Sequence, residues 1–273
     1  MPGLPDVSLT AFGVAAARAS ETTRVDRLFS DPFAEAFVRA AGPTHGAERE
    51  RPRALLDWIS VRTRFLDDLL LNSCAAGARQ VVIFGAGLDA RAFRLAWPSE
   101  VRLFELDLPG LLEFKEDVIR SEGWQPSCER ICVPVDLSGD WSEPLLGAGF
   151  AAGSLVAFSA EGLLAYLSAS TSDSLVARAA ELSSPGSRLG LTLASSRRLE
   201  TWRDAHPEPS ASASDYVSLW RSANAEHAIE WLASRGWHAR AFDVAERSAT
   251  YGRPLEQVSE RASGARLVDA ERR

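Results

Sequence analysis

Short apolar runs without polar alternation recur along the middle of the chain, and most of them end at a glycine or an acidic residue. Val81–Phe84 is the first, and a run of this kind predicts a strand that is buried on both faces, as in a parallel sheet. Segments with helical spacing separate the runs, for example at 109–122 and 171–182. Further strands are expected at 101–108, 130–137, 153–160, 187–193 and 237–243. This alternation predicts an α/β fold with a doubly wound, mainly parallel sheet.

The N-terminal part of the chain has helical periodicity instead. Helices are expected at 8–21, 33–41 and 53–73, with Asp31 as the N-cap of the second. Residues 1–73 are therefore expected to form a helical cap and a lead-in helix on the sheet. The whole chain of 273 residues is long enough for one large domain of this kind.

The C-terminal part is less regular. Residues 197–223 have no clear period and are rich in Ser, Ala, Pro and Trp, which predicts a lid inserted into the domain. A helix is expected at 226–235, with Gly236 as its stop. Glu271–Arg273 is expected to be a frayed tail.

A glycine turn, Gly85-Ala86-Gly87, directly follows the first strand. Glycines allow a sharp turn and a close approach of a ligand to the backbone, and a helix is expected next, over 89–97. Strand, glycine turn and helix are typical of a nucleotide site, although an ordinary tight turn is the alternative. The third small residue of the dinucleotide fingerprint is missing. Asp89 stands nearby, and an acid there disfavours phosphate but tolerates a cationic ligand such as S-adenosylmethionine.

Acidic residues close the following strands. Asp107 lies about 20 residues after the glycine turn, where a carboxylate can accept hydrogen bonds from both ribose hydroxyls. Glu105 has the same strand parity and is the alternative. Asp136 and Glu161 end the third and fourth strands, so the same edge of the sheet gains two more acids. Each acid could instead be a local cap or ion-pair partner.

Two motifs together resemble a known family. Gly-Ala-Gly-Leu-Asp-Ala-Arg-Ala-Phe-Arg-Leu at 85–95, followed by Phe-Glu-Leu-Asp-Leu-Pro at 104–109, is similar to the leucine carboxyl methyltransferase family, in particular its bacterial S-adenosylmethionine-dependent branch. The resemblance implies the Rossmann-like fold of class I methyltransferases. It also implies S-adenosyl-L-methionine as the cofactor.

The resemblance implies roles for several residues around that cofactor. Arg62, in Arg62-Thr-Arg64, would hold the methionine carboxylate, with Arg64 as the alternative. Asp136 would accept a hydrogen bond from the adenine amine, while Leu137 packs on the ring. Glu161, in Glu-Gly-Leu-Leu-x-Tyr-Leu, would accept one from the cofactor ammonium.

Candidate substrate contacts are more scattered. The resemblance implies that Arg18, in the alanine-rich first helix, points into the cofactor or substrate pocket, and a solvated arginine is the alternative. Tyr166 is expected to face the acceptor or to pack. Tyr216, in the expected lid, would line a pocket or anchor the lid. Tyr251 belongs to a Tyr-Gly-Arg segment that resembles the C-terminal one of the family.

The resemblance implies methyl transfer to an oxygen, and the residue types favour a carboxylate on a small metabolite or peptide as the acceptor. A carboxylate is already ionised near neutral pH and needs no general base, and the sequence offers no evident Ser-His-Asp or Cys-His arrangement. A hydroxyl acceptor would need a base such as Tyr166 or His206. Other possibilities are a cofactor-dependent cyclisation or lyase reaction, a nicotinamide oxidoreductase, and a protein that only binds the cofactor.

Composition argues against several other classes of protein. The net charge of −7 provides no basic field for nucleic acid or anionic lipid. Cys74, Cys128 and Cys132 suggest neither a disulfide framework nor a zinc site, and are expected to be idle thiols in a reducing cytoplasm. Neither a signal peptide nor a membrane span is expected, and no metal site. The oligomeric state has no signal in the sequence.

Overall fold

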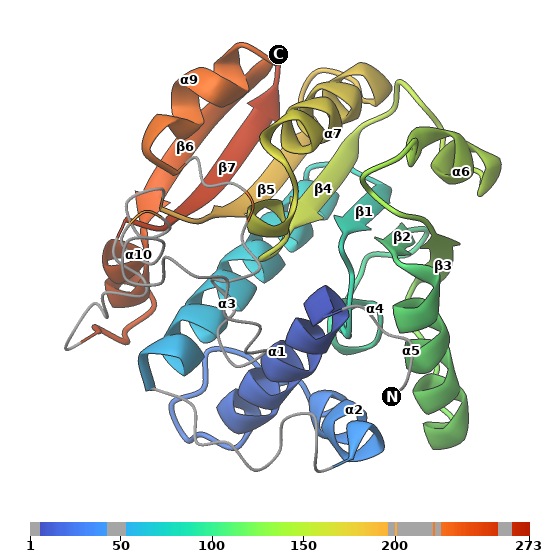
Figure 1. The fold of residues 1–273 in the computed structure, drawn as a ribbon, viewed down its shortest axis with the longest axis vertical. Helices are drawn as coiled ribbons and strands as arrows, with labels where there is room; N and C mark the ends of the chain where they lie inside the picture. The colour runs from blue at the N-terminus through green and yellow to red at the C-terminus, as the bar shows by residue number, and fades with distance from the viewer. Residues whose placement is uncertain (1–5, 43–52, 196–199, 201–220, 222–224, 256–263) are drawn as a thin grey trace.

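A sheet of seven strands in the order β3-β2-β1-β4-β5-β7-β6 forms the centre of the computed structural model (Figure 1). The structure describes residues 6–42, 53–195, 200, 221, 225–255 and 264–273. Strands β1 to β5 are parallel, and β7 is antiparallel to both of its neighbours. The strands are β1 (Gln80–Phe84), β2 (Arg102–Asp107), β3 (Glu129–Pro134), β4 (Val156–Ala160), β5 (Arg188–Leu193), β6 (Trp237–Asp243) and β7 (Arg266–Arg272). The predicted α/β class with a mainly parallel sheet is confirmed.

Helices cover both faces of the sheet. They are α1 (Asp6–Thr22), α2 (Ala34–Ala41), α3 (Arg53–Ala75), α4 (Arg91–Arg94), α5 (Pro109–Glu122), α6 (Ser142–Gly147), α7 (Ala169–Leu182), α9 (Ala228–Ala233) and α10 (Val244–Thr250), with 3-10 turns η2 (Leu164–Tyr166) and η4 (Ala225–His227). Figure 1 shows α6, α7 and α9 along the upper side of the sheet, and α1, α2, α3 and α5 on the lower side. Among the described helices, none is long and apolar enough to cross a membrane.

Strand β1 supplies side chains to both layers. Val81 and Ile83 belong to the core under α3 and α5, whereas Val82 and Phe84 belong to the core under α6 and α7. All of these residues are buried, which explains why the run lacks polar positions. The chain leaves β1 for β2 and β3 on one side and returns to β4 on the other. The carboxyl ends of β1 and β4 therefore form the switch point at which such sheets bind ligands.

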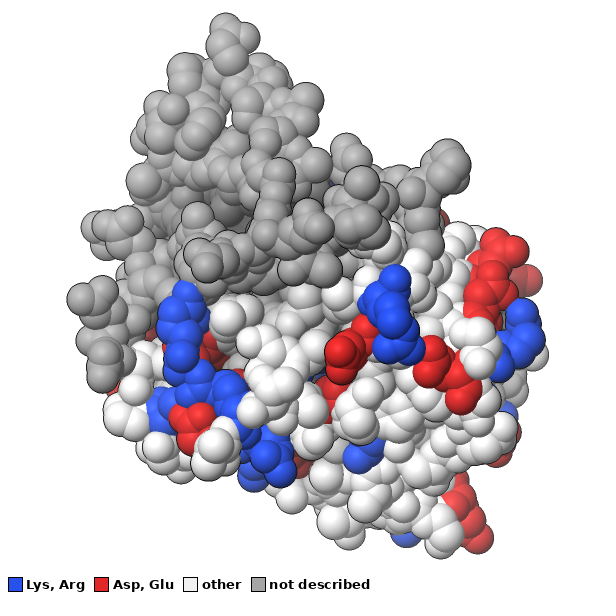
Figure 2. Space-filling model, turned by 90° about the horizontal axis from the view of Figure 1, so that it is seen from below, with Lys and Arg blue, Asp and Glu red and all other residues white. Residues whose placement is uncertain are grey.

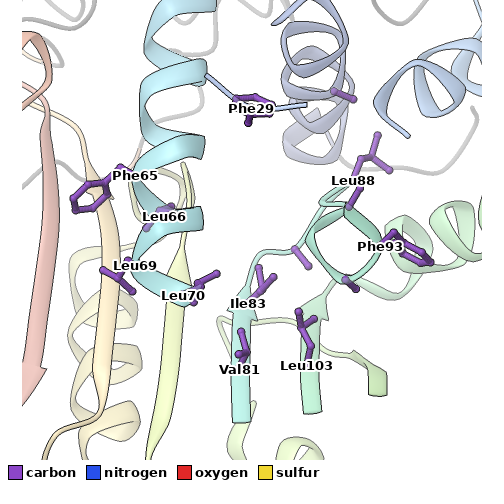
Figure 3. Close-up of a cluster of buried hydrophobic side chains, with 14 of the residues drawn as sticks. Phe29, Phe65, Leu66, Leu69, Leu70, Val81, Ile83, Leu88, Phe93 and Leu103 are labelled. Atoms are coloured by element: carbon purple, nitrogen blue, oxygen red, sulfur yellow. The ribbon is translucent and has the colours of Figure 1, made fainter. Parts of the chain in front are cut away.

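Helix α3 is fixed on the sheet by its C-terminal half. Leu66, Leu69 and Leu70 project from it into the core, as Figure 3 shows. A Cβ at Gly190 of β5 would lie 2.5 Å from a methyl carbon of Leu66, so the missing side chain lets the helix pack against the strand backbone. This contact holds the N-terminal half of α3 beyond the carboxyl ends of the strands.

The N-terminal helices form the expected cap. Phe12 of α1 packs edge-on against Phe114 of α5 at 5.2 Å between ring centroids. Asp31 Oδ1 accepts hydrogen bonds from the backbone N–H groups of Phe33 and Ala34, so it caps the turn that leads into α2, whereas the N-cap of the helix is Phe33 and not Asp31 as predicted. Over the described part of the face seen in Figure 2, basic and acidic side chains are interspersed.

Two further local predictions are wrong, and one more falls outside the description. The C-terminal tail is strand β7, whose Leu267, Val268 and Ala270 are fully buried between β5 and β6. The helix expected over 89–97 is only α4, because the chain is extended at Leu95. The expected lid at 197–223 lies outside the described residues, apart from two positions.

Candidate functional site

A cavity of about 650 Å³ opens at the carboxyl edge of the sheet. Its volume lies within the range of about 300–1,000 Å³ that is usual for small-molecule sites. The glycine turn, the ends of β2 to β5, and one side each of α1 and α3 form its wall. Ten of the residues expected in the site line it: Arg18, Arg62, Gly85, Ala86, Gly87, Asp107, Asp136, Leu137, Glu161 and Tyr166.

The glycine turn has the backbone conformation that requires glycine. Gly85 and Gly87 have φ of 63° and 49°, in the left-handed region. A Cβ at Gly85 would lie 2.8 Å from a methyl carbon of Leu163, so the turn also has no room for a side chain. All three residues of the turn line the cavity, so the turn can contact a ligand there.

Asp107 ends β2 and holds this turn in place. Its Oδ2 accepts a hydrogen bond of 2.6 Å from Gly87 N, and its Oδ1 accepts one of 2.7 Å from Leu108 N. Burial raises the pKa of Asp107, although both hydrogen bonds oppose the shift. Because a carboxylate has about four lone-pair positions, each oxygen can still accept a hydrogen bond from a ligand.

Asp136 and Leu137 follow β3 on the same side of the cavity. Asp136 Oδ1 accepts hydrogen bonds from the backbone and hydroxyl of Ser138, so its alternative role as a local cap is real. It also lines the cavity, and Leu137 beside it is buried. The pair is placed to contact a ring at this end, and its role toward adenine stays a prediction.

Glu161, after β4, is the centre of a buried ion cluster. Its Oε1 accepts from Arg62 Nε at 3.0 Å and Thr63 Oγ1 at 2.9 Å. Its Oε2 accepts from Arg18 Nη2 at 3.0 Å and Arg91 Nη2 at 2.7 Å. Burial alone would raise the pKa of this carboxyl, but the three guanidinium groups hold it well below the ordinary value. A cofactor ammonium could reach Glu161 only by displacing one of these donors.

Arg91 is the main member of the cluster that the sequence analysis missed. It is fully buried, and its Nε donates to Asp67 at 2.6 Å. Its Nη1 is bound to Asp89, and its Nη2 donates to Thr63 O at 3.2 Å as well as to Glu161. In the sequence, the feature that could have pointed to this cluster is the acid–arginine pair Asp89 and Arg91 directly after the glycine turn. Asp89 is therefore neutralised within the protein, and the cation preference expected from it loses its basis.

Arg18 and Arg62 keep donors that the cluster does not use. Within the described part of the chain, Nε of Arg18 is buried and has no hydrogen-bond partner. The terminal nitrogens of Arg62 lie against Gly162, where a Cβ would be 2.9 Å from Nη1. Both residues line the cavity, and guanidinium groups bind carboxylates well. The pair can therefore hold an anionic group near Glu161.

Comparison with known proteins agrees with the motifs. Residues 11–180 match the leucine carboxyl methyltransferase family. The chain belongs to that family. A protein of Streptomyces coelicolor, named as a candidate S-adenosyl-L-methionine-dependent methyltransferase, is 45% identical over 273 residues, which cover 97% of this chain and 95% of the relative. A protein of Frankia alni with the same description is 44% identical over 264 residues, with 93% and 91% covered.

Solved structures share the fold at low sequence identity. A DUF574 family protein from Streptomyces avermitilis matches with a TM-score of 0.58 and 15% identity, covering 95% of this chain and 96% of its own. Magnesium protoporphyrin IX methyltransferase from Synechocystis PCC 6803, with bound SAH, matches with a TM-score of 0.52 and 13% identity, covering 88% and 94%. These likenesses confirm the class I methyltransferase architecture.

Two of the expected site residues do not line the cavity. Glu105 is fully buried and lies 2.7 Å from both Lys115 Nζ and Arg130 Nη2. It shares the parity of Asp107, but it is two residues deeper in β2, where α5 covers the sheet. Its carboxylate is an internal ion-pair partner and does not line the cavity.

Tyr251 is the second such residue. It packs against Arg64, with 5.4 Å between the guanidinium and the ring, and burial raises its pKa. Arg64 pairs with Asp68 and does not line the cavity, whereas Arg62 does. His206 and Tyr216 lie outside the described residues.

Proposed function

We propose that this protein is an S-adenosyl-L-methionine-dependent methyltransferase whose acceptor is a carboxylate of a small metabolite or peptide. The family and the named relatives support methyl transfer with this cofactor. The observation that carries the proposal is one cavity in which Asp107, across the glycine turn, faces the same space as Arg18 and Arg62. These groups suit a ligand with a ribose and an amino-acid carboxylate.

The residues present fit that cofactor. Arg62 and the buried, unpartnered Nε of Arg18 would hold the methionine carboxylate. Asp107 would accept the ribose hydroxyls, since its oxygens each retain a free lone-pair position. Asp136 and Leu137 would bind the adenine. When bound, the cofactor supplies the methyl group: an acceptor oxygen lone pair forms the new bond to carbon as the carbon–sulfur bond breaks, and S-adenosylhomocysteine leaves.

The cavity favours a nucleophile that is already ionised. Among the described residues, no histidine lines it. Asp89 and Glu161 are held by arginines, and Asp107 and Asp136 already accept hydrogen bonds from the backbone, which leaves Tyr166 as the candidate base among the described lining residues. A hydroxyl acceptor would need a base, whereas a carboxylate needs none. The protein would then act by aligning the reactants and by excluding water.

Labelled methyl transfer tests this proposal. The enzyme would be screened with methyl-labelled S-adenosylmethionine against carboxylic acids and phenols. The expected product is a methyl ester, which mild alkali cleaves with release of labelled methanol. A methyl ether survives this treatment, so alkali-stable label together with a rate that depends on His206 would overturn the carboxylate acceptor. The cofactor site would be unaffected by that outcome.

A further inference from the structure

The order of the strands divides the cavity into two sides. The glycine turn, Asp107 and Asp136 follow β1, β2 and β3, which run outward from the switch point in one direction. Residues 162–171 follow β4 and residues 192–195 form the end of β5 and the chain after it, in the other direction. Helix α1 covers the first side, where a Cβ at Gly87 would lie 3.4 Å from Ala11. Helix α3 packs on β4 and β5 and covers the second side.

The second side is mainly apolar, and it has aromatic side chains beside a cation. Its lining includes Leu55, Trp58, Ile59, Tyr166, Leu167 and Leu193. The guanidinium of Arg62 lies 5.7 Å from the centre of the Trp58 ring, and Tyr166 lines the same cavity. Arg221 is a second described cation in this wall, and its backbone N–H donates to Ala165 O at 2.6 Å.

The negative charge on this side of the cavity is already bound by donors of the protein itself. Among the described lining residues, Glu161 is the one acid that borders it, and its two oxygens already have four donors. If a cofactor ammonium displaced one of these donors, the carboxylate would still be fully used. An ammonium on the acceptor would therefore be removed from water without a counter-charge, which is costly.

We infer that the acceptor is an apolar, preferably aromatic monocarboxylic acid with no ammonium group beside its carboxylate. The inference rests on the proposed function and specifies its substrate class. The aromatic and aliphatic wall would bury the body of the acid, and the positive charge of Arg221 would attract its carboxylate, since Arg62 is engaged by Glu161 and by the cofactor. Free amino acids would be rejected, because they carry the same carboxylate with an unpaired ammonium.

Matched pairs of acids test the inference. Each of 3-phenylpropanoate, 3-(indol-3-yl)propanoate and 4-methylpentanoate would be compared with the amino acid that differs from it only by the ammonium. Binding to the enzyme saturated with S-adenosylhomocysteine would be measured by calorimetry, and methyl transfer in parallel. We expect at least one deaminated acid to bind about 100-fold or more tightly than its amino-acid partner. Equal affinity within the pairs, or no binding of any deaminated acid, would overturn the inference.

The binding measurement separates this inference from the proposed function. A deaminated acid that binds more tightly than its amino-acid partner but receives no methyl group would contradict carboxylate methylation and still support the charge preference of this side of the cavity. Trp58→Ala should weaken binding of the aromatic acids about tenfold and weaken S-adenosylhomocysteine binding less, since Trp58 touches the cofactor site only through Arg62. Trp231→Ala is the matched control, because Trp231 bonds to Asp173 outside the cavity. If Trp58→Ala does not fold, Trp58→Leu serves, and unchanged affinity in a folded variant would remove Trp58 from the site.

Discussion

Asp107 connects the backbone of the glycine turn to the proposed ribose contact. Replacing it with alanine removes the acceptor for both hydroxyls and releases Gly87 and Leu108. Hydrogen bonds to a charged group contribute about 1.5–3 kcal/mol, so Asp107→Ala should weaken S-adenosylhomocysteine binding by about 10- to 150-fold in titration calorimetry. Asp140→Ala is the control, because this exposed acid caps Ser142 and does not line the cavity. Unchanged affinity in the folded Asp107 variant would refute the assignment.

Arg91 and Arg94 are a natural pair for a second test. Both are buried and bind Asp67, but only Arg91 also reaches Asp89 and Glu161. Lysine cannot reproduce the fork of a guanidinium. Arg91→Lys should therefore weaken S-adenosylhomocysteine binding about tenfold or more and leave 5′-methylthioadenosine, which lacks the amino-acid part, within about twofold.

Arg94→Lys should change neither affinity in the folded protein, although it lowers stability. If both variants weaken both ligands equally, the effect is general destabilisation and Arg91 does not position the amino-acid end of the site. Calorimetric titration of the two ligands with each variant distinguishes these results.

At the scale of elements, Glu161 ties four segments together. Its donors come from α1, α3 and α4, while it stands at the end of β4. The folded-state pKa of Glu161 lies well below 4.5, so its charged form stabilises the fold fully above that pH. This stabilisation is lost as the pH falls from there through the folded-state pKa.

Glu161→Gln should therefore cost about 3–5 kcal/mol at neutral pH, because it leaves buried arginines without their counter-charge. The difference from the wild type should shrink as the pH falls below 4.5. Urea unfolding over a pH series measures it, with Glu181→Gln as the control at an exposed pair. A difference that does not depend on pH would contradict the ionised cluster.

The sequence predicted the elements whose buried residues form a clear apolar pattern along the chain. The run at 81–84 is apolar throughout because the sheet buries both of its faces, and this pattern identifies a central parallel strand. β7 escaped notice because its apolar residues stand among charges, and only its pairing with β5 and β6 specifies a strand. Its side chains at Arg266 and Glu271 remain partly exposed, as the charged pattern suggests.

The site could be predicted only in part: the acids at the strand ends could be placed, but their partners could not. Asp107, Asp136 and Glu161 could be placed because chain order alone sets them at one edge of a parallel sheet. The alternation of side chains along β2 puts Glu105 on the same face as Asp107, but it could not show that Glu105 lies deeper in the sheet, beneath α5. The partners of Glu161 could not be derived, because Arg18 is 143 residues away along the chain. Contacts of that kind depend on the packing of the cap on the sheet.

At the scale of the whole molecule, burial controls the ionisation of the three cysteine thiols and therefore their reactivity. It raises the pKa of Cys74 to about 11 and the pKa of both Cys128 and Cys132 to about 12. At pH 8 each thiolate should be about a hundredfold or more scarcer than in a free cysteine. Alkylation by iodoacetamide, followed by mass spectrometry, should therefore be slow in the native protein and fast in guanidinium. Native alkylation at the rate of a free thiol would contradict the packing around that residue.

Binding of the cofactor product tests the proposed site most directly. Titration calorimetry of the wild-type protein at neutral pH, with S-adenosylhomocysteine and NAD in separate runs, measures it without knowledge of the acceptor. The cavity formed by the glycine turn, Asp107 and the two arginines predicts one S-adenosylhomocysteine bound per chain and no heat from NAD. The absence of binding at millimolar S-adenosylhomocysteine, with clear binding of NAD, would contradict a methyltransferase site in this cavity.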